Sequence, residues 1–361
     1  MENKKGLERI ESPRYIFFGP SAISKVEEVL QSLNAKDPIL VISGPSVTRR
    51  VAEDIISILE VDRKVSHLIS SSGRFEDVIS ILSVARKTRI DLIIGVGGGR
   101  PLDTTKLVAA EIGVRYIVVP TSASHDGIAS PAISFTLSRE AEERLGRMKR
   151  IEPPIAIIAD TTIISRASSL TFKSGFGDLV AKVTAVRDWE LAYKLRDEPY
   201  SEYAASMSLL SARIAMDHAS EIRSGLEEST RILVKALIGS GVAMSIAGSS
   251  RPASGSEHMF SHALDMISSE LGVGTAPHGI QVALGTIMMA YLQGQDWRFI
   301  REKLIEAGVP TTAEEAGLNP DLVIRALTIA HKVRERYTIL GESGLTPSAA
   351  EKLARVTGVI K

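Results

Sequence analysis

Short apolar runs and longer amphipathic segments alternate along the first part of the chain, up to Asp160. Most of the runs are rich in β-branched side chains and have no polar face, as strands buried on both sides require. The predicted strands are Ile39–Ser43, Val65–Ile69, Leu92–Val96, Tyr116–Pro120, Ile133–Leu137 and Ile155–Ala159. Helical spacing fills intervals between them at Val47–Leu59, Phe75–Lys87 and Leu102–Ile112. Strands and helices that alternate in this way predict βαβ crossovers and a parallel sheet.

The pattern changes after Asp160, where strand-like runs end and helical spacing continues to the end of the chain. The predicted helices there are Leu179–Leu195, Glu202–Ile222, Arg231–Ala247, Ile280–Leu292, Trp297–Ala307, Asp321–Glu335 and Pro347–Val356. A length of 361 residues also exceeds what one simple core usually holds. We therefore predict an α/β domain with a Rossmann-like parallel sheet over residues 1–162 and an all-α domain over residues 163–361.

Composition excludes several classes of protein. Lys plus Arg and Asp plus Glu number 43 each, so no net charge attracts the chain to nucleic acid or to a membrane surface. The apolar run Ile232–Gly248 contains Lys235 and many small residues, which predicts a buried core helix rather than membrane insertion. The chain has no cysteine, which excludes disulfides and thiolate nucleophiles and fits a reducing cytoplasm.

A glycine-rich turn marks the first candidate site. Gly97, Gly98 and Gly99 follow a predicted strand, and a helix is expected to open at or just after Pro101. Glycines let the backbone approach a phosphate, and the free N–H groups of a helix start attract anions. The next strand ends in the hydroxyl-rich segment 120–130, at the edge where parallel sheets bind ligands. Together the two segments favour a nucleotide site, although the glycines alone also fit a tight turn and their spacing is not the usual dinucleotide fingerprint.

The end of the first predicted strand bears on the choice of nucleotide. It reads Ser43-Gly44-Pro45-Ser46, without the acidic residue that grips a ribose 2′-hydroxyl and repels a 2′-phosphate. Arg49 and Arg50 follow shortly. We expect both NAD(H) and NADP(H) to be accepted if ribose lies here, unless these arginines are ordinary surface residues of a helix.

Three of the seven histidines gather in one stretch of the second half. His258 and His262 lie one helical turn apart on a predicted helix that ends near Glu270. The loop that follows is long enough to return His278 to the side of His258. Asp178, at the predicted N-terminal end of another helix, must come from across the helical half. Imidazoles combined with a carboxylate are typical ligands of a catalytic divalent metal, with one position left open for substrate.

Five motifs together resemble the superfamily of glycerol dehydrogenase, dehydroquinate synthase and iron-containing alcohol dehydrogenase. Within it, the chain looks most like the archaeal sn-glycerol-1-phosphate dehydrogenases. The motifs are the segments 97–103, 121–131, 175–179, 251–258 and 277–279. The resemblance extends over essentially the whole chain, and the combination is specific although each motif alone is not. It implies a dehydroquinate synthase-like fold, with the active site in a cleft between a nucleotide domain and a helical domain.

The resemblance also implies roles for particular residues. It assigns Zn²⁺, with Fe²⁺ as the alternative, to Asp178, His258 and His278. It places Asp126, Asp178 and His262 beside the substrate as catalytic and substrate-binding residues. It places NAD(H) or NADP(H) against Gly97, Gly98, Gly99, Arg100, Pro101, Thr121, Ser122, Ala123, Ser124 and Ser130. The implied reaction is the reversible reduction of dihydroxyacetone phosphate to sn-glycerol 1-phosphate, for the archaeal phospholipid backbone, by a homo-oligomer.

Several roles stay open in the sequence. The predicted proton donor to the alkoxide is His262 or a water chain from Asp126, and a hydrogen bond to a substrate hydroxyl is an equal role for His262. Arg251 or Lys182 is expected to hold the substrate phosphate, unless these are surface charges. The alternative functions are a polyol dehydrogenase acting on free glycerol, a dehydroquinate synthase-like lyase and a nucleotide sensor without catalysis. The lyase is disfavoured because the motifs offer few basic side chains around the metal.

Overall fold

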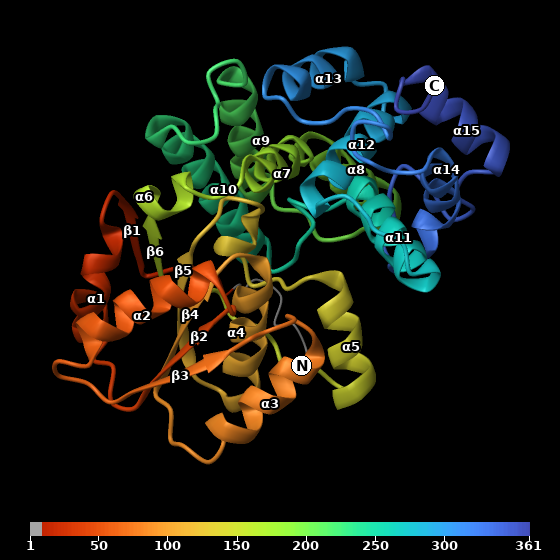
Figure 1. The fold of residues 1–361 in the computed structure, drawn as a ribbon. Coiled ribbons are helices and arrows are strands. Elements are labelled where there is room, and N and C mark those ends of the chain that lie inside the picture. The colour runs from red at the N-terminus through yellow and green to blue at the C-terminus, as the bar shows by residue number, and fades with distance from the viewer. Residues whose placement is uncertain (1–8) are drawn as a thin grey trace.

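The computed structural model describes residues 9–361, and its first half is a parallel sheet. Its six strands have the order β1-β6-β5-β4-β2-β3, and every neighbouring pair is parallel. The strands are β1 (Tyr15–Gly19), β2 (Ile39–Ser43), β3 (Val65–Ile69), β4 (Leu92–Gly97), β5 (Arg115–Pro120) and β6 (Ala156–Asp160). The helices of this half are α1 (Val26–Ser32), α2 (Val47–Leu59), α3 (Phe75–Ala85), α4 (Gly99–Ile112) and α5 (Phe135–Leu145) (Figure 1).

The two faces of the sheet pack against different helices. In β2, Ile39 and Val41 belong to a core cluster with α1 and α2, whereas Leu40 and Ile42 belong to a cluster with α3 and α4. Every residue of β2 is buried, which explains why this strand reads as a continuous apolar run.

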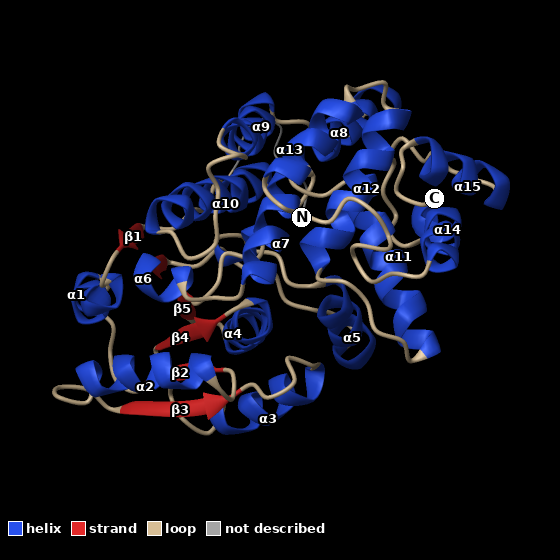
Figure 2. Ribbon diagram, turned by 45° about the horizontal axis from the view of Figure 1, so that its top comes forward, coloured by secondary structure: helices blue, strands red, loops and turns tan. Residues whose placement is uncertain are grey.

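The second half contains helices and no strand among the described residues, as the sequence predicts (Figure 2). The helices are α6 (Thr161–Ser165), α7 (Ser169–Val180), α8 (Lys182–Arg196), α9 (Glu202–Asp217), α10 (Glu227–Ala247), α11 (Ser256–Leu271), α12 (His278–Leu292), α13 (Trp297–Glu306), α14 (Pro320–Ile329) and α15 (Pro347–Val356). Within residues 9–361, α10 is the one helix long and apolar enough to cross a membrane, and 61% of its most apolar window is buried inside the protein. The predicted fold class, a parallel α/β sheet followed by an all-helical part, is confirmed.

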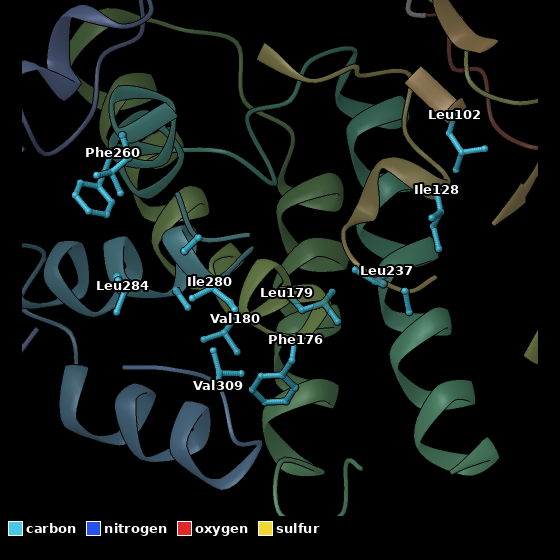
Figure 3. Close-up of a cluster of buried hydrophobic side chains, with 14 of the residues drawn as sticks. Leu102, Ile128, Phe176, Leu179, Val180, Leu237, Phe260, Ile280, Leu284 and Val309 are labelled. Atoms are coloured by element: carbon cyan, nitrogen blue, oxygen red, sulfur yellow. The ribbon is translucent and has the colours of Figure 1, made fainter. Parts of the chain in front are cut away.

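One apolar cluster joins the two halves. It contains Leu102 of α4 and Ile128, and it continues through Leu237 of α10 to Phe176 of α7 and Ile280 of α12. Figure 3 shows these side chains, which come from several different helices and, for Ile128, from the short 3-10 turn after β5. The loop after β5 is therefore packed directly on the helical half, which brings residues 121–130 to the metal-ligand candidates.

Two sequence predictions are wrong in instructive ways. Residues Ile133–Leu137 are not a strand: the chain bends and then starts α5 at Phe135, while the Ser134 N–H donates to Asp103. A short apolar run does not distinguish a strand from the start of a helix. The helix predicted over Leu179–Leu195 is two helices, α7 and α8, so Asp178 lies near the C-terminal end of α7 and not at a helix N-terminus.

Candidate active site

The two predicted nucleotide loops lie side by side at the carboxyl edge of the sheet. β4 and β5 are paired neighbours, and the Thr121 N–H donates to the Gly97 carbonyl at 3.0 Å. Gly97 has φ +151°, and a Cβ there would lie 2.3 Å from Pro101 Cγ, so the turn requires glycine. A Cβ on Gly98 would lie 3.1 Å from Ser122 Oγ. The glycine-rich turn and the hydroxyl-rich segment therefore face each other closely.

A cavity of about 930 Å³ opens beside these loops. Helix α4 begins at Gly99, earlier than the sequence predicts, so its first turn reaches the cavity. The predicted nucleotide residues that line it are Gly99, Arg100, Ser124 and Ser130. The remaining ones, which belong to the same two loops but do not line the cavity, are Gly97, Gly98, Pro101, Thr121, Ser122 and Ala123.

Buried Lys106 fixes the position of the second loop. Its ammonium donates to the carbonyls of Gly127 at 2.7 Å and Ala132 at 2.6 Å, and it lies 3.5 Å from Asp103 Oδ1. The side chain is fully buried, so these contacts replace water around the charge. No sequence motif identified this residue, because its role depends on a loop more than twenty residues away.

The structure brings the predicted metal ligands together on the opposite side of the cavity. Asp178, His258 and His278 come from α7, α11 and α12, and each offers a ligand atom within 4.8 Å of the other two. His258 Nε2 lies 3.4 Å from Asp178 Oδ1, and the rings of His258 and His278 are 5.1 Å apart. All three residues contribute to the lining of the cavity.

Glycines allow this convergence, because α7 and α12 touch backbone to backbone. A Cβ on Gly177 would lie 2.3 Å from the carbonyl oxygen of Gly279, and a Cβ on Gly279 would lie 1.9 Å from the carbonyl oxygen of Ser174. Each of these glycines is adjacent in sequence to a ligand, Asp178 or His278. The close helix crossing therefore sets the distance between carboxylate and imidazole.

Hydrogen bonds fix which nitrogen of His278 is free. Gln281 Nε2 donates to Asp265 Oδ1 at 2.8 Å and to the Ala276 carbonyl at 2.7 Å, so Gln281 Oε1 is an acceptor. Ser261 Oγ donates to that oxygen at 2.9 Å, so the single hydroxyl proton of Ser261 is already used in this bond. The contact of 3.0 Å between Ser261 Oγ and His278 Nδ1 must then be donated by the histidine. His278 Nε2 keeps its lone pair, and burial lowers the pKa of His278 to about 3.

His258 is oriented in a similar way. Its Nδ1 lies 2.9 Å from Glu257 Oε1, and the other carboxylate oxygen of Glu257 accepts from Thr184 Oγ1 at 2.9 Å. Burial opposes ionisation of Glu257, but the hydrogen bond and charge of His258, together with backbone donors such as the Gly255 N–H, outweigh it and lower the pKa of Glu257. An imidazole whose second nitrogen donates to a carboxylate is a common arrangement at metal ligands.

A buried network links Asp178 to Asp126. The Asp126 N–H donates to Asp178 Oδ2 at 2.9 Å, and Lys182 Nζ contacts Asp126 Oδ2 at 2.8 Å and Asp178 Oδ1 at 3.1 Å. Ser240 Oγ also donates to Asp126 Oδ2, at 2.7 Å. Burial alone would lower the pKa of Lys182, but Asp126 and Asp178 outweigh it and raise this pKa. Burial likewise opposes ionisation of Asp178, yet Lys182 and His258 hold its pKa well below the usual range.

His262 stands in a stack of rings beside the ligands. Its ring lies 4.7 Å from that of Phe135 at 21° and 5.8 Å from that of His278 at 15°. Burial, and next the nearby Arg334 charge, hold the pKa of His262 well below its ordinary value. A neutral imidazole that lines the cavity suits a hydrogen bond to a substrate hydroxyl better than it suits proton donation as a cation.

The expected phosphate-binding residues are both engaged within the protein. Lys182 is held by Asp126 and Asp178, and it is a buried residue rather than a surface charge. Arg251 is also buried, paired with Glu198, and donates to the Tyr337 carbonyl at 2.9 Å. The alternative that Arg251 and Lys182 are surface charges is therefore wrong, whereas a role of either in binding the phosphate stays a prediction.

Arg49, near the end of the first predicted strand, is exposed on α2 and pairs with Glu53 at 2.9 Å, as the alternative of an ordinary surface arginine predicts. The arginines beside the cavity, in contrast, were not predicted. Arg334, which the motifs do not include, lines the cavity, and Arg336 donates to Ser250 Oγ at 2.9 Å in the neighbouring loop. Neither carries a sequence signal, because both lie in an irregular segment after α14.

Comparison with known proteins decides the family. A protein of Korarchaeum cryptofilum, named glycerol-1-phosphate dehydrogenase (NAD(P)+), is 78% identical over 87% of this chain and 100% of its own length. One of Hyperthermus butylicus with the same name is 49% identical over 98% of this chain and 99% of its own. The chain belongs to the glycerol-1-phosphate dehydrogenase family. The family model for iron-containing alcohol dehydrogenase matches residues 17–168. The resemblance seen in the motifs is thus confirmed.

Solved structures show how widely the glycerol-1-phosphate dehydrogenase family shares its fold. A glycerol dehydrogenase from Schizosaccharomyces pombe has a TM-score of 0.76 at 19% identity, over 97% of this chain and 90% of its own. A probable glycerol dehydrogenase from Sinorhizobium meliloti has a TM-score of 0.74 at 18% identity, over 97% and 98%. At such identities the likeness concerns architecture alone.

Proposed function

We propose that the chain is an NAD(P)H-dependent, metal-assisted oxidoreductase that reversibly reduces dihydroxyacetone phosphate to sn-glycerol 1-phosphate. The product would supply the archaeal phospholipid backbone. The observation that carries the proposal is the convergence of Asp178, His258 and His278 on one cavity with the glycine-rich turn. The names of relatives that are 46–49% identical over nearly the whole chain point to the same reaction.

Asp178, His258 and His278 would hold the metal, and their donor set fits one. Two imidazole nitrogens with lone pairs and an ionised carboxylate match Zn²⁺, and the same set also suits Fe²⁺. A bound cation would supply Lewis acidity to the ketone oxygen of the substrate. Ser261, Gln281 and Glu257 would keep both rings in the required tautomer.

The dinucleotide would bind along the carboxyl edge of the sheet. Residues 97–101, 121–124 and Ser130 are its proposed contacts, with the N–H groups of the first turn of α4 facing the phosphates. The nicotinamide would supply the hydride, a chemistry that no side chain provides. The family name gives both NAD and NADP, which agrees with the lack of an acidic residue after β2.

Asp126 and His262 would bind and orient the substrate. Asp126 is held by Lys182 and Ser240 and lines the cavity, so it is placed to accept a hydrogen bond from a hydroxyl or to relay a proton through water. His262, neutral and without a hydrogen-bond partner for its ring within residues 9–361, would bind a second substrate hydroxyl or oxygen.

The test compares NADH oxidation with dihydroxyacetone phosphate and with dihydroxyacetone, followed by chiral analysis of the product. We expect strong preference for the phosphorylated ketone and formation of the sn-1 isomer. Equal turnover of both ketones would indicate a polyol dehydrogenase instead. The variant His258→Ala should lose bound metal and turnover together while keeping its fold, and a metal-free variant with full activity would refute the metal assignment.

We also propose a cytoplasmic homo-oligomer. The absence of cysteine suits a reducing compartment. An apolar stripe on α9 supports self-association: Tyr203, Leu210 and Ile214 lie at helical spacing and are 67%, 56% and 38% exposed. Light scattering after size exclusion should show more than one subunit, and Leu210→Glu should shift the mass toward the monomer. A monomeric wild-type protein would contradict this proposal.

A further inference from the structure

Arg334 lies one aromatic ring away from His262. It follows α14 and a short 3-10 turn (Ala330–Lys332), in a segment without regular structure. Its guanidinium carbon lies 5.0 Å from the centre of the Phe135 ring, and the His262 ring is stacked on the same phenyl ring at 4.7 Å. The side chain lines the same cavity as His258, His262 and His278.

No counter-charge contacts Arg334 among residues 9–361. Within residues 9–361, no carboxylate lies within ion-pair distance of its guanidinium, and no side-chain or backbone oxygen accepts a hydrogen bond from it. Burial lowers its pKa, and the more distant Glu142 only partly opposes this. A cation that is partly buried without a partner is costly unless an anion completes the site.

Other basic groups near the helical side of the cavity are occupied. Lys182 is held by two aspartates, Arg251 pairs with Glu198, and Arg336 donates to Ser250 and to the Ser254 carbonyl. Of this group, Arg334 therefore keeps its N–H donors available for a ligand. Two other arginines that line the cavity, Arg74 and Arg100, lie beside the glycine-rich turn and are exposed.

We propose that Arg334 binds the phosphate of the substrate and thereby selects the phosphorylated ketone over free dihydroxyacetone. The inference rests on the proposed function. A guanidinium presents paired donors in a planar fork that matches a phosphate, and a partly desolvated site strengthens such bonds. Phe135 packs against both the guanidinium of Arg334 and the ring of His262, which would bind a substrate hydroxyl, so one substrate molecule would contact both Arg334 and His262.

The test measures kcat/KM for both ketones in wild type, Arg334→Ala and Arg334→Lys, with bound metal and melting temperature recorded for each protein. Charged hydrogen bonds contribute about 1.5–3 kcal/mol, so Arg334→Ala should lower kcat/KM for dihydroxyacetone phosphate by roughly 10- to 150-fold. The loss should appear mainly in KM, and kcat/KM for dihydroxyacetone should fall much less, so that the preference for the phosphorylated ketone shrinks. Arg334→Lys should recover part of the loss, because it keeps the charge without the fork.

Inorganic phosphate gives a readout independent of catalysis. It should raise the melting temperature of the wild-type holoenzyme and of the control Lys332→Ala, which removes an exposed cation two positions away, but not that of Arg334→Ala. Equal losses on both ketones, or a phosphate response that survives in Arg334→Ala, would overturn the assignment. If the wild type shows no preference for the phosphorylated ketone, the proposed function fails, whereas the phosphate response still decides whether Arg334 binds this anion.

Discussion

Replacing Gly177 by alanine should weaken metal binding more than it weakens the fold. The added Cβ would lie 2.3 Å from the Gly279 carbonyl oxygen, against an ordinary carbon–oxygen contact of about 3.3 Å. The crossing of α7 and α12 must therefore widen by about 1 Å. Overpacking of this kind costs about 1–3 kcal/mol, and the higher helix propensity of alanine returns about 1 kcal/mol. A net loss of at most about 2 kcal/mol leaves the protein folded.

The same displacement is large for the ligands. Asp178 and His278 are the next residues on the two helices, and metal sites need their ligands held within about 0.5 Å. We expect metal affinity, measured by competition with a chromogenic chelator, to fall at least about tenfold. The matched control is Gly274→Ala, in the loop before His278, where a Cβ meets no atom within 4 Å. Wild-type metal affinity in Gly177→Ala would refute the idea that the glycine contact sets the ligand distance.

Further predictions concern the surroundings of the two loops and of the ion. Lys106→Met should lower the free energy of unfolding, measured with denaturant, by about 3 kcal/mol, because it leaves buried Asp103 without its counter-charge. The same change should raise KM for NADH, and an unchanged KM would show that the loop after β5 is held in place without Lys106. Ser261→Ala should weaken metal affinity by about 10- to 100-fold, since His278 loses the acceptor for its Nδ1–H; equal affinity would disprove the tautomer assignment. Chelator dialysis should lower the melting temperature of the wild type and added Zn²⁺ should restore it, whereas His258→Ala should melt at one temperature with or without chelator.

The sequence predicts five of the six strands of the sheet to within a residue. Strands β2, β4 and β6 show continuous apolar runs because both of their faces are buried. Strand β3 lies at an edge and is only partly buried, yet its bounds were also predicted. Strand β1, at the opposite edge, was missed, and Ile16 in it is 45% exposed. The segment around Phe135 was assigned as a strand, although its apolar side chains face the cavity and the histidine stack.

The site divides along similar lines. Motif residues such as His258 and His278 were predicted to lie side by side, and the structure places their ligand atoms within 4.8 Å of each other. Gln281, Lys106 and Arg334 were not identified, because each acts through a contact that depends on the tertiary fold and not on spacing along the chain. Arg251 was misjudged for the same reason: its partner Glu198 comes from the loop after another helix.

The apolar cluster that runs from α4 through the segment after β5 into α10 and α12 limits how this enzyme can be taken apart or recombined. Since the sheet half and the helical half share one apolar interior, cutting the gene between them would expose buried side chains of both. A chimera that borrows its dinucleotide half from a distant relative would inherit mismatched side chains across that interior. Changing coenzyme preference is therefore a task for substitutions at the sheet edge, not for exchange of whole modules.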